Sequence, residues 1–91
     1  MTQIYLLNRF KEKKHYRYSV SVFKEGFPAV SRYITFSDYS GIFEYMNTEL
    51  KIYYNIKYEI LGFNKKEKEA MEGGLEKLLK EKKNGKNKKR N

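Results

Sequence analysis

The side chains able to act in catalysis are few in this chain. It contains one histidine, one aspartate and no cysteine among 91 residues. His15 lies in the run KEKKH with no orienting carboxylate identified, so a solvated loop histidine is favoured over a general base. No carboxylate pair, metal-ligand cluster or glycine-rich phosphate loop is recognisable. We therefore expect a protein that is not an enzyme and that uses no cofactor and no metal.

Basic side chains supply the remaining chemistry. The formal net charge is +9, and the last ten residues, KKNGKNKKRN, hold six cations and no acid. A second group of cations lies in residues 11–15. Clustered lysines favour a polyanion such as nucleic acid, and phosphate contacts of this kind weaken steeply as salt rises. A tail that only aids solubility is the alternative for residues 82–91.

Hydrophobic periodicity predicts the elements that position these cations. Alternation of apolar and polar residues predicts strands at 3–10, 16–22 and 30–36, with a turn at Gly26. A period of about 3.6 then predicts a helix with Ser37 as its N-cap, ending near residue 53 or 54. We expect a fourth strand at 56–61, added at a sheet edge, although an all-β arrangement of 52–63 is an alternative.

A second helix is predicted from Asn64, which forms a capping-box pattern with Glu67. Its apolar stripe consists of Met71, Leu75, Leu78 and Leu79, and the acids cease after residue 81. Gly73 and Gly74 weaken this helix and indicate either a hinge or a close approach to the sheet. The expected fold is α+β, a three-stranded antiparallel sheet packed by a helix, followed by a fourth strand and a C-terminal helix. Residues 1–81 form one domain, and 82–91 a disordered basic tail.

One face of the middle strands is predicted to stay open. If the Tyr16-to-Val22 alternation turns its apolar side to the helix, the other side carries small polar, cationic and aromatic residues able to approach a nucleic-acid backbone or groove. The alternative is an ordinary solvated sheet face. Arg32 falls on the apolar side, so it either joins the open face through a bulge or needs a carboxylate partner. The predicted nucleic-acid-binding residues are Arg9, Lys11, Lys13, Lys14, Arg17, Ser19, Ser21, Ser31, Arg32, Tyr33, Lys82, Lys83, Lys86, Lys88, Lys89 and Arg90.

The stretches YRYSVSVFKEG and RYITFSDYSGIFEYMNTEL carry a resemblance to a known family. Residues 16–54 resemble the AP2-like, arm-type DNA-binding domain of phage and transposon integrases. Tyr16-Arg17-Tyr18, Gly26 and Thr35-Phe36 occupy the positions of that family's strand, turn and strand end. The resemblance implies that the exposed sheet face reads the major groove of duplex DNA. By carry-over its residues would be Arg17, Ser19, Ser21, Ser31 and Tyr33.

Two other functions remain open. A phage-type inhibitor could bind a host protein or ribonucleoprotein, with Tyr5, Leu7 and Phe23 as exposed anchors. An RNA- or ribosome-associated accessory protein is the third alternative, because the tail does not distinguish RNA from DNA. The excess of lysine over arginine and the many Asn, Ile and Tyr residues favour a low-GC bacterium, a phage or a mobile element as the source. We expect a cytoplasmic protein without a signal peptide or membrane span, whose partner is DNA ahead of RNA.

Overall fold

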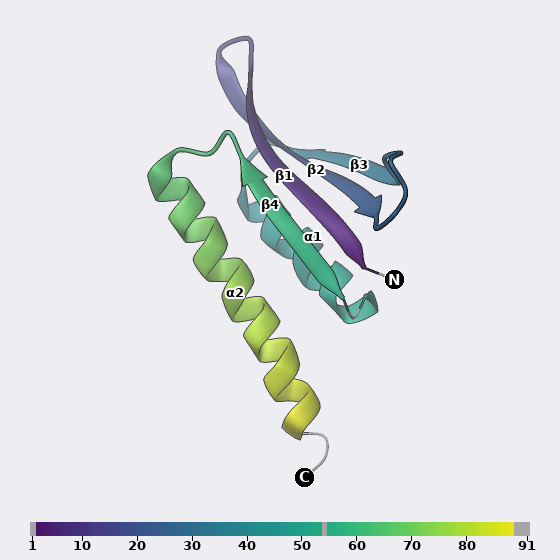
Figure 1. Cartoon of the computed structure of the whole chain (residues 1–91). Coiled ribbons are helices and arrows are strands. Elements are labelled where there is room, and N and C mark those ends of the chain that lie inside the picture. Colours follow the sequence, from purple (N-terminus) through teal and green to yellow (C-terminus); the bar gives the residue numbers. More distant parts are fainter. Residues whose placement is uncertain (1, 54, 89–91) are drawn as a thin grey trace.

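The protein is described by a computed structural model, which covers residues 2–53 and 55–88 and describes side chains as far as Glu81. Its elements are β1 (Gln3–Glu12), β2 (His15–Lys24), β3 (Arg32–Phe36), α1 (Ser40–Ile52), β4 (Ile56–Leu61) and α2 (Lys65–Lys88) (Figure 1). The order β-β-β-α-β-α and the α+β class are those predicted. No helix of the described residues is long and apolar enough to cross a membrane.

The four strands form one mixed sheet in the order β3-β2-β1-β4. β2 pairs antiparallel with both β1 and β3, and β4 lies at the edge, parallel to β1. The parallel pairing needs a crossover, which α1 provides between β3 and β4. The predicted fourth strand at 56–61 is therefore confirmed, and the first strand of the chain becomes a central one.

Both helices contribute to one core on one side of the sheet (Figure 1). Tyr5 and Leu7 of β1 point into this core, and the strand residues opposite them belong to the same layer. The helices supply Ile42 and Met46 from α1, and α2 contributes residues 71 and 75 of its predicted apolar stripe. Two expectations change here: Tyr5 and Leu7 are fully buried and are not exposed anchors.

The first two strands are longer than predicted. We expected strands at 3–10 and 16–22 joined by a charged loop at 11–15, but the pairing continues to Glu12 opposite His15. Only Lys13 and Lys14 form the turn, and Lys13 adopts a left-handed backbone conformation with φ 56°. The physical reason is that hydrogen bonds of a hairpin ladder do not require apolar side chains, so the pairing outlasts the alternation of the sequence.

The third strand and the first helix also begin later than predicted. β3 starts at Arg32 and not at residue 30. The N-cap of α1 is Tyr39 rather than Ser37, and the capping acceptor is the Asp38 side chain, whose Oδ1 accepts a 2.8 Å hydrogen bond from the Ser40 backbone N–H. Hydrogen bonds from Ser40 lower the pKa of the Asp38 carboxyl. The helix ends at Ile52, one or two residues earlier than expected.

The second helix begins as predicted and ends later. The Asn64 side chain accepts a 2.8 Å hydrogen bond from the Glu67 backbone N–H at its first turn. We expected the helix to fray after Glu81, but the helical backbone continues to Lys88. Lysine is a good helix former, and cations near a helix C-terminus interact favourably with its dipole.

Of the paired glycines of α2, only Gly74 lies close to another element, and that element is α1 rather than the sheet. A Cβ atom placed on Gly74 would lie 2.3 Å from Cε1 of Phe43, whereas one on Gly73 would meet no atom within 4 Å. Gly74 therefore permits the two helices to pack side by side. Gly73 has no such role.

Candidate nucleic-acid interface

The end of β1 and the start of β2 form a two-stranded arm, residues 9–18, whose tip reaches beyond both helices (Figure 1). All six residues from Lys11 to Tyr16 are solvent-exposed. Backbone pairing holds the ribbon together up to its two-residue turn. The arm therefore presents the lysines of the predicted loop on a regular strand pair.

Three lysines near the tip of the arm have no charge partner. Lys11, Lys13 and Lys14 form no ion pair with any residue that the structure describes. His15 is exposed beside them. These cations are neither neutralised nor buried, and they lie at the tip of a projecting arm, where they can contact a polyanion.

The base of the arm is fixed to α2 and to the loop after β4. Nε of Arg9 lies 3.0 Å from Oε1 of Glu67, a contact of charges without an aligned hydrogen bond. The other oxygen of Glu67 accepts a 2.8 Å hydrogen bond from the Tyr18 hydroxyl. Burial first, and this carboxylate second, raise the pKa of Tyr18. Gly62, at φ 78°, leaves no room for a Cβ, which would lie 2.2 Å from the Arg9 carbonyl oxygen.

Arg9 also stiffens the arm itself. Its guanidinium carbon lies 3.6 Å from the centre of the Tyr16 ring, and Nζ of Lys11 lies 6.0 Å from the same ring. Contacts between a cation and an aromatic face at such distances are attractive. Arg9 was predicted to bind nucleic acid, but in the structure it holds the arm against α2.

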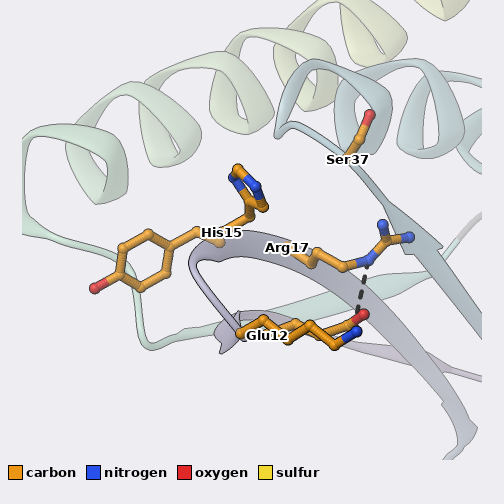
Figure 2. A pocket seen from close by; sticks show the side chains of 6 residues that line it. Glu12, His15, Arg17 and Ser37 are labelled. Atoms are coloured by element: carbon orange, nitrogen blue, oxygen red, sulfur yellow. Dashed lines mark ion pairs between the residues drawn. The ribbon is translucent and has the colours of Figure 1, made fainter.

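A hollow of about 400 Å³ lies between the arm and the end of β3, lined by Glu12, Lys13, His15, Tyr16, Arg17 and Ser37. Figure 2 shows Arg17 directed at Glu12, to which it forms an ion pair of 3.8 Å. Arg17 also donates a long 3.4 Å hydrogen bond to the Thr35 hydroxyl. The Glu12 side chain is largely exposed, so this pair is screened by water and contributes little to stability.

The open face of the sheet is the side opposite the helices, and none of the described residues outside the sheet covers it (Figure 1). Arg17, Ser19, Ser21 and Tyr33 all lie on this face, as predicted, and Ser31 is exposed at the start of its outer edge. Ser19, however, is only 2% exposed and is not available to a ligand.

The open face is also more apolar than predicted. Register with β2 places Ile4, Leu6 and Phe10 on it, and Phe23 stands beside Ile4. Each of these four side chains is half-buried rather than covered. The sequence showed that both sides of the first strand carry apolar residues, but not that both would be used. This face therefore combines apolar side chains with the small polar, cationic and aromatic residues that were predicted.

Arg32 lies on the helix-facing side of the sheet. Of the two predicted alternatives, a bulge or a carboxylate partner, the structure shows the carboxylate partner. Its Nη1 lies 3.2 Å from Oε2 of Glu49, and Nη2 pairs with Oε1. Glu49 is 3% exposed and accepts a further 2.8 Å hydrogen bond from the Tyr5 hydroxyl. Burial and the bond to Glu49 raise the pKa of Tyr5, and burial followed by the Glu49 charge raises the pKa of Tyr45 to about 12.

The arginine of this cluster is thereby engaged in the fold. The bond to Glu49 raises the pKa of Arg32 itself, against the opposing effect of burial. The guanidinium also lies 5.8 Å and 5.7 Å from the ring centres of Tyr45 and Tyr53. Arg32 therefore connects β3 to α1 and does not join the open face.

Three lysines near the arm were not predicted as part of the site. Lys65, Lys66 and Lys68 are exposed in the first turn of α2, on either side of the Glu67 that holds Arg9. The alternation of lysine with glutamate along this helix concealed them, because it looked like a set of mutually neutralised surface pairs. The tail cations were predicted at Lys82, Lys83, Lys86, Lys88, Lys89 and Arg90, and their side chains lie outside the described residues.

The comparisons with known proteins identify no relative of the chain. No protein-family model matches the chain, and neither a curated protein nor a solved structure matches it. The resemblance to arm-type DNA-binding domains therefore remains a prediction. Among the side chains that the structure describes, no group of three or more His, Cys, Asp or Glu residues is placed to hold a metal ion.

Proposed function

We propose that the protein binds nucleic acid, duplex DNA ahead of RNA, chiefly through the arm. The observation that supports this most directly is the set of exposed and unpaired lysines, Lys11, Lys13 and Lys14, on a paired ribbon anchored at its base. Ammonium groups held in this way can contact several phosphates at once and release their counterions. The tail cations would add affinity that does not depend on sequence.

The shape of the arm favours duplex DNA over duplex RNA. A two-stranded ribbon fits the major groove of B-form DNA, which is about 12 Å wide. The major groove of an A-form RNA helix is deep and narrow, so a ribbon with side chains on both faces cannot enter it. For RNA the arm could contact only the outer backbone, with fewer phosphates reached.

Single-stranded nucleic acid is a weaker candidate. Proteins that bind single strands combine cations with exposed aromatic rings on which bases stack. Within the arm the aromatic side chain most exposed is Tyr16, at 46%, and Arg9 already lies over its ring. We therefore expect duplex DNA to bind more tightly than a single strand of the same sequence.

Gel-shift titrations with the full chain test the proposal. Duplex DNA, single-stranded DNA and duplex RNA of one sequence are compared at about 50 mM salt, where phosphate contacts are strongest. The expected order of affinity is duplex DNA, then the other two. If the chain binds none of the three, the proposed function is wrong. If it binds duplex RNA more tightly than duplex DNA, the protein is an RNA-binding protein instead.

A further inference from the structure

The open face of the sheet carries a group of apolar side chains that no described residue outside the sheet covers. Ile4, Leu6 and Phe23 are neighbours on the two middle strands and are each partly exposed, and Tyr33 on β3 is 59% exposed. Apolar side chains that lie together on a surface rimmed by polar residues are typical of interaction sites. We propose that this face binds the same face of a second copy, so that two sheets stack in a two-fold symmetric dimer.

The size of the face is adequate for a dimer. With ten residues in each of β1 and β2, five in β3 and six in β4, and with about 3.4 Å per residue and 4.8 Å between strands, the sheet covers roughly 500 Å² in plan. The relief of the side chains makes the accessible area larger than this plan area. Two such faces together reach about 1,000 Å², the smallest total area expected of a biological interface.

The strand register makes the face complementary to itself. A two-fold axis parallel to the strands, between β1 and β2, exchanges β1 with β2 and β3 with β4. Ile4 and Phe23 stand opposite each other in the β1–β2 register, so the axis brings Ile4 of one copy over Phe23 of the other. The two symmetry-related contacts between Ile4 and Phe23 are apolar. They would be enclosed between two sheets packed about 10 Å apart.

The polar residues of the face also match under the same axis. Tyr33 of β3 and Glu59 of β4 lie in one row across the sheet, through Ser21 and Leu6. The axis therefore places the Tyr33 hydroxyl over the carboxylate of the second copy's Glu59. An axis across the strands at the level of this row would instead oppose the two copies of Glu59, which like-charge repulsion disfavours.

The cation of this face is accommodated as well. Phe10 and Arg17 are register partners, so each Arg17 lies over the Phe10 ring of the other copy, where a guanidinium is attracted to the aromatic face. The same axis makes the two arms project side by side from one end of the dimer. The dimer itself does not depend on nucleic acid, and its test can be separated from that of the proposed function.

A charge-swap experiment tests the interface. Sedimentation equilibrium of the nuclease-treated full chain at about 0.15 M salt, over a wide range of protein concentration, is expected to show a dimer. Tyr33→Glu should weaken it at least about tenfold, because it sets a carboxylate against Glu59 of the other copy. Adding Glu59→Lys should restore the affinity. Ile52→Ser, at the 64% exposed Ile52 on the helix side, is the control and should change nothing.

A rescue by Glu59→Lys reports on contact between two copies and not within one copy. Within one copy residues 33 and 59 are on opposite edges of the sheet, roughly 14 Å apart at strand spacing, which exceeds the Debye length at this salt. A chain that is monomeric at every concentration would overturn the proposal. So would a Tyr33→Glu defect that Glu59→Lys does not repair, or an equal effect of Ile52→Ser. Melting curves of each variant show that it is folded.

Discussion

Neutralising the arm should lower both the salt dependence of DNA binding and the affinity at a given salt. Replacing Lys11, Lys13 and Lys14 by glutamine removes three exposed cations that have no ion-pair partner in the described chain. Each lost phosphate contact lowers the slope of log K against log salt by about 0.9, so the triple variant should lose about 2 to 3 units of slope. At about 0.1 M salt the same loss corresponds to a roughly 100- to 1,000-fold weaker complex.

A matched variant separates position from total charge. Lys24, Lys51 and Lys77 are exposed residues outside the arm, and replacing them by glutamine removes the same three charges. Fluorescence anisotropy with a short duplex, repeated at several salt concentrations, gives both slopes. We expect the control slope to change by less than half as much. If the two triple variants lose equal slope, binding depends on net charge alone and the arm has no special role.

Three further predictions concern the fold. Gly74→Ala should be less stable than Gly73→Ala by about 1 to 3 kcal/mol in urea unfolding, because only the former forces a Cβ against α1. Arg32→Met should destabilise the protein by about 1 to 3 kcal/mol, which is less than for a fully buried ion pair because 39% of the Arg32 side chain is exposed. Adding Glu49→Leu to this variant should recover part of the lost stability in the same assay. Stability should fall as pH rises from about 10 to about 12, because Tyr45 loses its proton in the unfolded chain over this range but keeps it in the folded protein, where its pKa is raised to about 12. Urea unfolding across this pH range should show a smaller fall in the Tyr45→Phe variant. Stability that rises with pH would contradict the prediction.

The arrangement of elements followed from sequence periodicity, because each element has a clear apolar pattern of its own. The strand at 56–61 and the capping of α2 by Asn64 are cases in which alternation or a capping residue was sufficient. The faces of β1 were not predictable in this way. Both of its sides are apolar, so only pairing with β2 and β4 decides that Tyr5 turns inward and Ile4 outward.

The candidate site was predicted in part. The lysines of residues 11–15 are exposed as expected, but their placement on a paired ribbon was missed because charged residues do not show the strand alternation. The carboxylate partner of Arg32 was not identified, although the sequence indicates it. Glu49 lies three residues after Met46 on the apolar stripe of α1, and an acid at such a position indicates a buried ion pair. The position of Arg32 on the apolar side predicted a need for a carboxylate, but not which carboxylate.

The parallel pairing of β1 with β4 has a consequence for biosynthesis. The strand made first lies in the middle of the finished sheet, and one of its edges has no partner until β4, some fifty residues later, has left the ribosome. An unpaired edge with apolar residues on both faces is a template for association between chains. Nascent chains that stall before β4 should therefore depend on chaperones more than those that stall after it.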